Sequence, residues 1–380
     1  MKTSPPTPRP STARPSDGPD RPATTRTREP VVRRASQVVL PAVGDPETLR
    51  VVRRELPAPA AGEALVRVEA TGVSFAEQQM RRGRYYDQPA FPFVPGYDLV
   101  GVVDEVGADV TGLAVGDRVA ALTKTGGWAT HVLLDARDLV PVPDGVAAED
   151  AETAIVNGVT AWRMLHRSAR VRSGQTVVVL GAAGGVGSFL VGLARDAGVR
   201  VIGVVGTPQL GAVAAMGAEP VDHRREDVAA RVRELAPEGV AAVFDHVGGP
   251  GIRDSWRMLA PGGTLVSYGT ASTRDDAGDP RVPVLRLLAR LAVWHVLPNR
   301  RRATFFDLWN GRRRNPSAYR RALREDLTAV LELLRDGRIA PAVAGRFALE
   351  DAAAAMRLAE RGGLTGKVLL LPGTASTPTS

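Results

Sequence analysis

Short alternating runs of apolar and polar residues fill the chain from about residue 35 to residue 150. Residues 63–70 alternate with a period of two, which directs Val66, Val68 and Ala70 to one face of a strand. Similar runs, separated by glycine or proline, cover residues 49–52, 99–107 and 115–121. Many short strands with closely spaced turns predict a small, barrel-like β domain.

The pattern changes near residue 150 to alternating helices and strands. Helical spacing over residues 151–165 precedes an apolar run at 175–180, a glycine-rich turn, a helical stretch at 188–197 and a strand at 200–206. Strand-like segments follow at 241–247 and 264–269, then a helix at 327–334 and a last strand at 367–371. This order predicts an open, doubly wound parallel sheet, so the fold class is α/β with a β-rich domain in front.

Charge is distributed unevenly along the chain. The net charge is +8, but residues 1–34 contribute +5 and residues 281–324 contribute +11, which leaves −8 for the rest. A nucleic-acid-binding protein needs a basic stripe on its folded core, so no nucleic-acid partner is expected. The basic segment also contains an apolar stretch in which Arg286 and Arg290 are four residues apart, as in helices that lie on membranes. Membrane-surface contact, a lid over a cleft, dimer packing and a solvated surface all remain open for it.

The chain ends and the cysteine count limit the remaining classes. Residues 1–34 and 374–380 are poor in apolar side chains and are predicted to be disordered tails. We find no secretory signal and no apolar run long enough to span a membrane, so a cytoplasmic location is expected. The absence of cysteine removes disulfides and thiolate metal sites.

Small residues dominate the turn between the predicted strand at 175–180 and the next helix. The loop reads Gly181-Ala182-Ala183-Gly184-Gly185-Val186-Gly187, which lets phosphate oxygens approach backbone N–H groups at a helix N-terminus. Tight turns also use glycine for steric reasons alone, but the strand–turn–helix context favours a dinucleotide site.

The end of the following strand indicates which dinucleotide binds. A site that prefers NAD places an acid there, whereas this chain has Val205-Gly206-Thr207 and no acid before Glu219. His223, Arg224 and Arg225 follow the next strand and could hold a 2′-phosphate, although they could also simply face solvent. We therefore predict NADPH as the cofactor.

Motifs in order along residues 49–373 resemble the medium-chain dehydrogenase/reductase superfamily, most closely its quinone oxidoreductase and zeta-crystallin group and the related vesicle amine transport branch. They include the segments 72–77, 94–98, 115–119, 126–129, 156–162, 243–249, 261–264 and 365–368, together with the glycine loop. The resemblance implies a GroES-like catalytic domain at 35–150 joined by 340–373. It also implies a Rossmann domain at 151–339, with a basic insertion at about 273–324. A homodimer joined through an edge strand at 303–309 is implied as well.

The same resemblance implies the site residues. Ser74 and Tyr85 are the candidate catalytic residues, although Ser74 stands where the group usually has Asn, and Gln79 replaces a second cleft tyrosine. The implied cofactor-binding residues are Asn157, Thr160, Ala183, Gly184, Gly185, Val186, Gly187, Thr207, His223, Arg224, Val247, Gly269 and Lys367.

Zinc chemistry is not expected. Zinc members of the superfamily carry Gly-His-Glu where this chain has Gly96-Tyr97-Asp98, and the five histidines show no ligand spacing. Without a Lewis acid, hydride transfer to a quinone or an α,β-unsaturated carbonyl is easier than reduction of a simple ketone, because the developing charge is delocalised. The alternative is an NADPH-binding protein of the vesicle amine transport kind, associated with a partner or membrane and turning over little.

Overall fold

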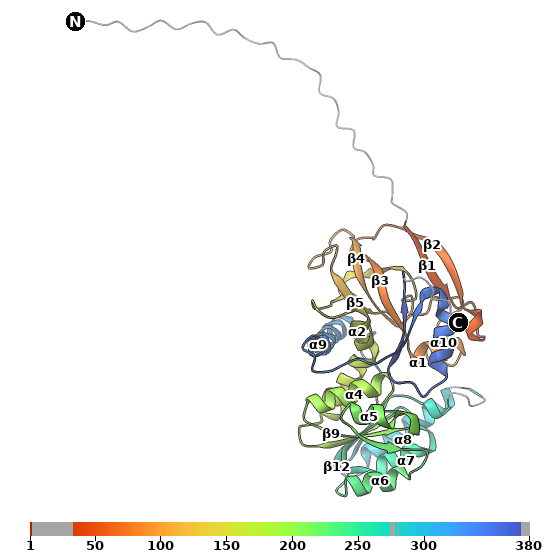
Figure 1. Ribbon diagram of the computed structural model, residues 1–380, viewed down its shortest axis with the longest axis vertical. Helices are drawn as coiled ribbons and strands as arrows, with labels where there is room; N and C mark the ends of the chain where they lie inside the picture. Colours follow the sequence, from red (N-terminus) through yellow and green to blue (C-terminus); the bar gives the residue numbers. More distant parts are fainter. Residues whose placement is uncertain (2–32, 274–277, 280, 374–380) are drawn as a thin grey trace. The chain divides into compact units, whose positions relative to one another are not determined.

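Two β-sheets organise the chain. The computed structural model of the 380-residue protein describes residue 1 and residues 33–273, 278–279 and 281–373. The predicted tails at 1–34 and 374–380 lie almost wholly outside these ranges. Figure 1 shows strands β3, β4 and β5 of the first sheet, and β9 and β12 of the second sheet with helices α4 to α8 around them.

The first sheet has the strand order β14-β15-β3-β4-β5-β7, with β6 also pairing with β3. Its predicted alternation is confirmed: Val66, Val68 and Ala70 of β3 are buried, whereas Arg67 between them is exposed. The C-terminal strand β15 pairs antiparallel with β3, so the last part of the chain returns to the first sheet. The strands are β3 (Glu63–Val73), β4 (Asp98–Val106), β5 (Arg118–Leu122), β6 (His131–Asp135), β7 (Val140–Pro141), β14 (Val343–Ala348) and β15 (Lys367–Leu371). A separate two-stranded ribbon pairs β1 (Arg33–Val39) with β2 (Arg50–Leu56). Helix α10 (Ala352–Glu360) packs on β14 and β15, and α1 (Phe75–Arg81) contacts α10.

The second sheet is parallel throughout, with the order β10-β9-β8-β11-β12-β13. Because helices cover both faces, its central strands are apolar and fully buried, and the predicted doubly wound sheet is confirmed. Its strands are β8 (Thr176–Leu180), β9 (Arg200–Val205), β10 (Glu219–Asp222), β11 (Val240–Asp245), β12 (Leu259–Ser267) and β13 (Arg302–Phe305). The helices around it are α4 (Gly185–Asp196), α5 (Leu210–Ala215), α6 (Val228–Leu235), α7 (Ile252–Arg257) and α8 (Arg281–Val296). Helix α9 (Pro316–Arg335) packs on α3 and contacts β7 of the first sheet.

One long helical segment leads from the first sheet into the second. It consists of α2 (Ala148–Thr153), a π-helical turn (Ala154–Gly158), α3 (Val159–Trp162) and a second π-helical turn (Arg163–Ala169). π-Helical turns inside helices occur often at functional sites. Here the first one carries Asn157.

The basic segment forms helix α8, which packs on the second sheet. Leu287 and Leu291 are buried, and Trp294 stacks on Trp256 with ring centroids 5.1 Å apart. The guanidinium groups of Arg290 and Arg301 each lie 5.9 Å from one ring of this pair. Among the described residues, no helix is both long enough and apolar enough to cross a bilayer.

The edge strand is shorter than the sequence predicts. We expected a strand over residues 303–309, but β13 ends at Phe305. The side chain of Asp307 accepts a hydrogen bond from the backbone N–H of Trp309 at 2.9 Å, and this local turn competes with the strand ladder. Phe306 still donates its backbone N–H to the carbonyl oxygen of Ser267 in β12 at 2.8 Å, and residues 307–309 leave the sheet. Residues 306–309 line a cleft.

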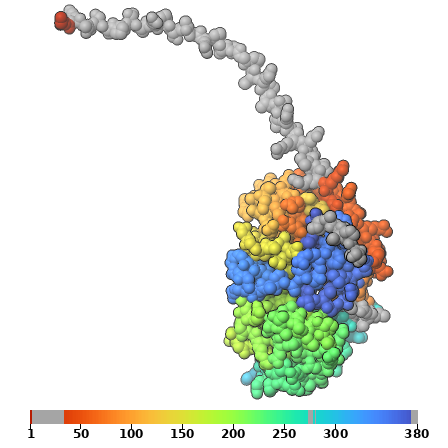
Figure 2. All heavy atoms as spheres, viewed as in Figure 1, coloured from red at the N-terminus to blue at the C-terminus, as the bar shows by residue number. Residues whose placement is uncertain are grey.

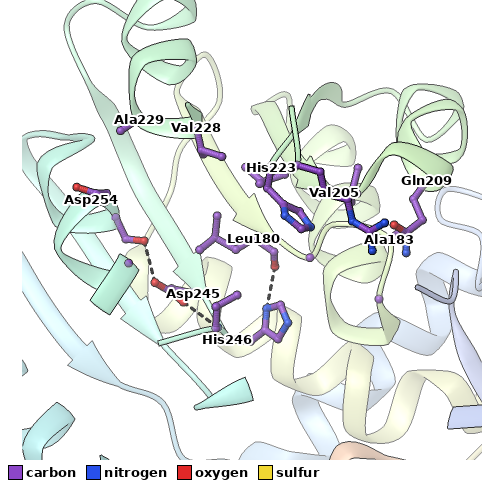
Figure 3. A pocket seen from close by; sticks show the side chains of 18 of the residues that line it. Leu180, Ala183, Val205, Gln209, His223, Val228, Ala229, Asp245, His246 and Asp254 are labelled. Atoms are coloured by element: carbon purple, nitrogen blue, oxygen red, sulfur yellow. Dashed lines mark hydrogen bonds between the residues drawn. The ribbon is translucent and has the colours of Figure 1, made fainter. Parts of the chain in front are cut away.

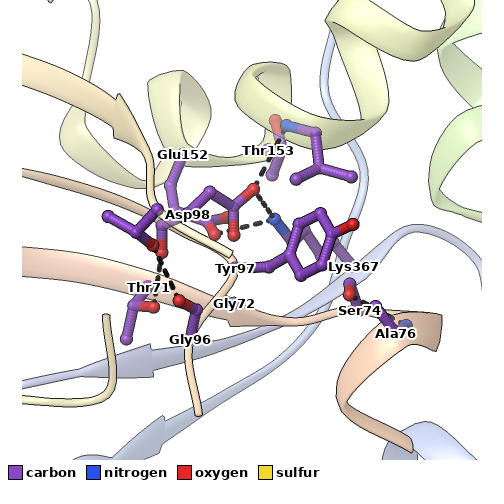
Figure 4. A network of polar contacts seen from close by, with 12 residues as sticks. Thr71, Gly72, Ser74, Ala76, Gly96, Tyr97, Asp98, Glu152, Thr153 and Lys367 are labelled. Carbon is purple, nitrogen blue, oxygen red and sulfur yellow. Dashed lines mark hydrogen bonds and ion pairs between the residues drawn. The ribbon is translucent and has the colours of Figure 1, made fainter. Parts of the chain in front are cut away.

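Three buried ionisable side chains, which we call the Lys367 cluster, tie the C-terminal strand to the first sheet and to α2. The Nζ atom of Lys367 lies 2.6 Å from Asp98 Oδ2 and 2.7 Å from Glu152 Oε1 (Figure 4). Asp98 Oδ2 also accepts a hydrogen bond from the backbone N–H of Val156 at 3.1 Å. Burial alone would lower the pKa of Lys367, but the two carboxylates raise it above its ordinary value. The ammonium therefore stays charged and holds three chain segments together.

Gly366, the residue before this lysine, contacts the loop that follows β8 of the second sheet. The backbone N–H of Gly366 donates to the carbonyl oxygen of Ala183 at 2.9 Å. Gly366 has a φ of 92°, and a side chain there would collide with Ala342. In Figure 2 the blue C-terminal part lies between the orange and yellow residues of the first sheet and the green residues of the second.

Replacing Lys367 by Met should lower the free energy of unfolding by about 3–5 kcal/mol, because Asp98 and Glu152 would lose their buried counter-ion. Urea unfolding measures the change. The control is Arg357→Met, which removes an exposed ion pair with Glu47 and should cost less than about 1 kcal/mol. Similar losses in the two variants would contradict this reading of the cluster.

Candidate functional site

The glycine loop, residues 181–187, joins β8 to α4. Gly181 has a φ of 68°, and a side chain there would collide with the imidazole of His246. A side chain at Gly187 would collide with the carbonyl of Gly181. The first N–H groups of a helix have no partner inside it and favour anions. Bare main-chain amides therefore occupy the start of α4.

A first cavity of about 510 Å³, which we call the groove, runs over the carboxyl ends of β8, β9 and β11 (Figure 3). This edge of an open parallel sheet is where such folds bind ligands. Gln209, His223 and Arg224 line the groove and gather around Gly206. A Cβ atom at Gly206 would lie 3.3 Å from Arg224 Nε, 3.4 Å from Gln209 Oε1 and 3.6 Å from His223 Nε2. A cation and two further polar groups thus surround one point at the end of β9.

An acid lies closer to this point than the sequence spacing indicated. Asp222, the last residue of β10, accepts hydrogen bonds from the Thr207 hydroxyl and from the backbone N–H of Arg224, the latter at 2.9 Å. The Thr207 hydrogen bond lowers the pKa of Asp222. Neither Thr207 nor Asp222 lines the groove. The carboxylate is therefore engaged with its own neighbours, and so is the hydroxyl of Thr207.

Asp245 and His246 shape the floor of the groove at the end of β11. Asp245 Oδ1 accepts the backbone N–H groups of Val247 and Gly248, both at 2.8 Å, and its Oδ2 accepts the hydroxyl of Ser255 at 2.8 Å. His246 Nδ1 lies 3.1 Å from the carbonyl oxygen of Leu180. Burial lowers the pKa of His246, so the imidazole is neutral at pH 7 and donates to that carbonyl.

A second cavity of about 680 Å³, which we call the cleft, shares Gly181, Gly184, His246 and Gly363 with the groove. The two cavities therefore meet at the glycine loop. Helix α8 supplies part of the cleft wall through Pro283, Val284 and Leu288. The apolar lining includes Phe75, Pro283, Val284, Leu288, Phe305, Phe306 and Leu364.

The two candidate catalytic residues both line the cleft, in different states. Ser74 is the N-cap of α1: its hydroxyl donates to Glu77 and accepts the backbone N–H of Ala76 at 3.1 Å. Its proton is therefore engaged in the cap. Tyr85 is buried, with its hydroxyl 2.7 Å from that of Tyr97, which in turn accepts the indole N–H of Trp309.

The predicted cofactor residues are divided between the two cavities. Asn157 and Thr160 line the cleft, and the Asn157 amide lies so close to Gly185 that a Cβ there would be 2.5 Å from it. Lys367 lines the cleft as well, but its ammonium is turned to the Lys367 cluster. Of the remaining predicted residues, Ala183, Gly184, His223, Arg224 and Val247 line the groove, and Gly184, Gly185, Val186, Gly187 and Gly269 line the cleft.

Sequence reasoning missed Gln209, His246, Tyr97 and Trp309. Tyr97 was visible as the departure from Gly-His-Glu, but nothing local paired it with Trp309, more than two hundred residues later. Within the described part of the chain, no group of three His, Cys, Asp or Glu side chains could hold a metal ion.

Family models match two parts of the chain. Residues 60–144 match the alcohol dehydrogenase GroES-like domain, and residues 216–370 match the zinc-binding dehydrogenase model. The chain is 30% identical over 330 residues to the synaptic vesicle membrane protein VAT-1 homolog of Danio rerio, covering 84% of this chain but just under two thirds (66%) of that protein.

A bacterial relative and a solved structure match more of their own length. The quinone oxidoreductase of Pseudomonas aeruginosa is 36% identical over 246 residues, which are 63% of this chain and 74% of that protein. The crystal structure of Escherichia coli quinone oxidoreductase complexed with NADPH superposes with a TM-score of 0.77 at 25% identity, covering 89% of this chain and all of that one.

The neutral state of His246 predicts a pH dependence of stability. Folding lowers its pKa, so its contribution is complete above the ordinary value of about 6.5 and is lost as the pH falls below it. The difference in unfolding free energy between the wild type and His246→Gln should therefore shrink from pH 7 to pH 5.5, by up to about 1.4 kcal/mol per pH unit. Urea unfolding at several pH values measures it, and a constant difference would contradict the prediction.

Proposed function

Because the chain belongs to the medium-chain dehydrogenase/reductase superfamily, in the group of the quinone oxidoreductases and VAT-1 homologues, we propose that it transfers hydride from NADPH to a quinone or an α,β-unsaturated carbonyl. One observation supports this most directly: the groove and the cleft meet at a loop of bare amides. A dinucleotide laid across that loop would place its pyrophosphate on the start of α4 and its two halves in the two cavities.

The groove favours NADPH over NADH. Arg224, His223 and Gln209 converge on Gly206, where a 2′-phosphate would be held by a charged donor and polar neighbours. Asp222 does not oppose this, since Thr207 and the Arg224 backbone engage its carboxylate outside the groove. When bound, NADPH supplies the hydride.

The cleft favours a conjugated, largely apolar acceptor. Its apolar walls exclude water from the face of the substrate, while Asn157 and Thr160 stand beside the glycine loop. Tyr85 can donate a hydrogen bond to an oxygen on which negative charge develops. Hydride addition at a conjugated carbon needs the substrate to be oriented and the negative charge on its oxygen to be stabilised. The final proton can come from water.

We propose that the reaction does not use zinc. Tyr97 stands where zinc relatives carry a histidine, and Asp98 is bound by Lys367. The region that matches the zinc-binding dehydrogenase model contains three histidines, at 223, 246 and 295, and no cysteine. These side chains do not provide a zinc ligand set.

A second candidate function is NADPH binding with little turnover, as in a protein that acts through a partner or a membrane. The state of Ser74 favours it, because the hydroxyl caps α1 and is not free to donate into the cleft. Tight NADPH binding without oxidation by any quinone or enone would select this function.

We further propose a cytoplasmic homodimer. The position of β13 at the end of the strand order, within the described part of the chain, supports the dimer, since an edge strand can join that of a second copy.

Activity should appear as a decrease in NADPH absorbance in the presence of simple quinones or enones. Treatment with a metal chelator should not lower the rate of this decrease. A panel of substituted benzoquinones, naphthoquinones and alkyl enones tests the substrate class. Turnover that depends on added zinc, or no affinity for NADPH in calorimetry, would refute the proposed function.

Arg224→Ala should weaken NADPH binding about 10- to 100-fold and leave NADH binding nearly unchanged, because a charged hydrogen bond to the 2′-phosphate is lost. The matched control is Arg225→Ala, since Arg225 is the next residue but does not line the groove. Fluorescence titration of both cofactors measures the effect. Equal weakening by the two variants would show that only general positive charge matters.

A further inference from the structure

Three aromatic side chains in the cleft form a hydrogen-bonded series that crosses between the two sheets. Tyr85 and Tyr97 come from the segment between α1 and β4, whereas Trp309 follows β13 of the second sheet. All three line the cleft. The rings of Tyr97 and Trp309 meet edge to face at 5.4 Å, and those of Tyr85 and Tyr97 meet likewise at 6.4 Å.

The donor and acceptor groups of the three side chains indicate the direction in which each hydrogen bond is donated. An indole N–H can only donate, so the Tyr97 oxygen is an acceptor for Trp309. Either hydroxyl can donate in the 2.7 Å contact between Tyr97 and Tyr85. We assign the proton to Tyr97, because a phenol oxygen that already accepts one strong hydrogen bond is a poorer second acceptor. The proton of Tyr85 is thereby left for a partner other than Tyr97. Within the protein that partner is the neighbouring hydroxyl of Tyr86, which also lines the cleft, and a substrate oxygen bound there would replace it.

The surroundings keep both phenols protonated and in place. Burial, followed by the neighbouring tyrosines, raises the pKa of Tyr85, and burial raises that of Tyr97. The backbone N–H of Tyr97 donates to Glu77 Oε1 at 2.7 Å, and the next residue is Asp98 of the Lys367 cluster. Trp309 packs at 6.3 Å on Tyr319, and its turn is closed by Asp307. The series is therefore attached to fixed elements at both ends.

On this basis, and resting on the proposed function, we propose that Tyr97 and Trp309 are positioning residues that hold Tyr85 as the hydrogen-bond donor to the oxygen of the acceptor. As hydride adds to the conjugated carbon, the C=C electrons move toward the carbonyl, and the oxygen gains negative charge. Tyr85 donates a hydrogen bond to that oxygen without giving up its proton, and water then protonates the enolate. Each bond of the series polarises the next, which strengthens the terminal donor.

A phenolate that mimics the enolate tests the donor without turnover. The probe is 4-nitrophenolate, titrated into the NADP⁺-loaded protein at a pH where the free phenol is ionised, with its absorption band as the signal. Tyr85→Phe should weaken binding about 10- to 100-fold and abolish the band shift on binding. Wild-type protein that binds NADPH but not the probe would overturn the inference.

The positioning role is tested by a double-mutant cycle. Tyr97→Phe and Trp309→Phe should each weaken probe binding several-fold while the affinity for NADPH and the thermal midpoint stay close to wild type. Adding Tyr97→Phe to Tyr85→Phe should have little further effect, since Tyr97 acts through Tyr85. Additive losses, or a Tyr97→Phe protein that binds the probe like wild type, would overturn the inference.

Kinetics separate this inference from the proposed function. With an enone substrate, Tyr97→Phe should lower kcat several-fold with little change in KM, because the hydrogen bond strengthens only as charge develops. A protein that reduces quinones but whose kcat is unaffected by Tyr85→Phe would defeat the inference and leave the proposed function standing. A protein without NADPH affinity would defeat the proposed function itself.

Discussion

The buried contact of Lys367 with Asp98 and Glu152 is the constraint on which the site depends. One ammonium joins the last strand, the start of β4 and helix α2, and Gly366 beside it is hydrogen-bonded to the glycine loop. Buried charges are costly unless they are paired, so this arrangement is possible only when all three segments are in place. The segment that completes the first sheet therefore also contacts the glycine loop, through the backbone of Gly366.

The lining of the cleft consists of apolar walls and a few hydrogen-bond donors held in fixed positions. Ser74, one of the two candidates that the family resemblance gave, is engaged in capping α1. Tyr85 remains as a donor, and Tyr97 occupies the place where zinc relatives have a ligand. In the proposed reaction, this position therefore supports a hydrogen-bond donor where zinc relatives carry a metal ligand.

The basic segment has a structural explanation that its charge did not suggest. Trp294 of α8 stacks on Trp256, and Arg290 and Arg301 each lie over one of these rings, while the first half of the helix faces the cleft. Its arginines remain largely at the surface. In α8 the arginines and the buried apolar side chains therefore lie on different faces of the helix.

Local sequence patterns were sufficient to predict the helices, the strands and the glycine loop. Strand alternation, helical spacing and a tight strand–helix turn all depend on residues that are neighbours in the sequence. The β3 alternation and the parallel order of the second sheet were predictable in this way. The end of β13 at Phe305 was not, since the turn made by Asp307 competes with the sheet ladder. Contacts between distant residues were also decided only by the tertiary structure: Asp222 beside Thr207, Lys367 with its two carboxylates, and Trp309 against Tyr97. The sequence shows which groups can donate, accept or carry charge, whereas their pairing depends on which segments the packed sheets bring within hydrogen-bonding distance.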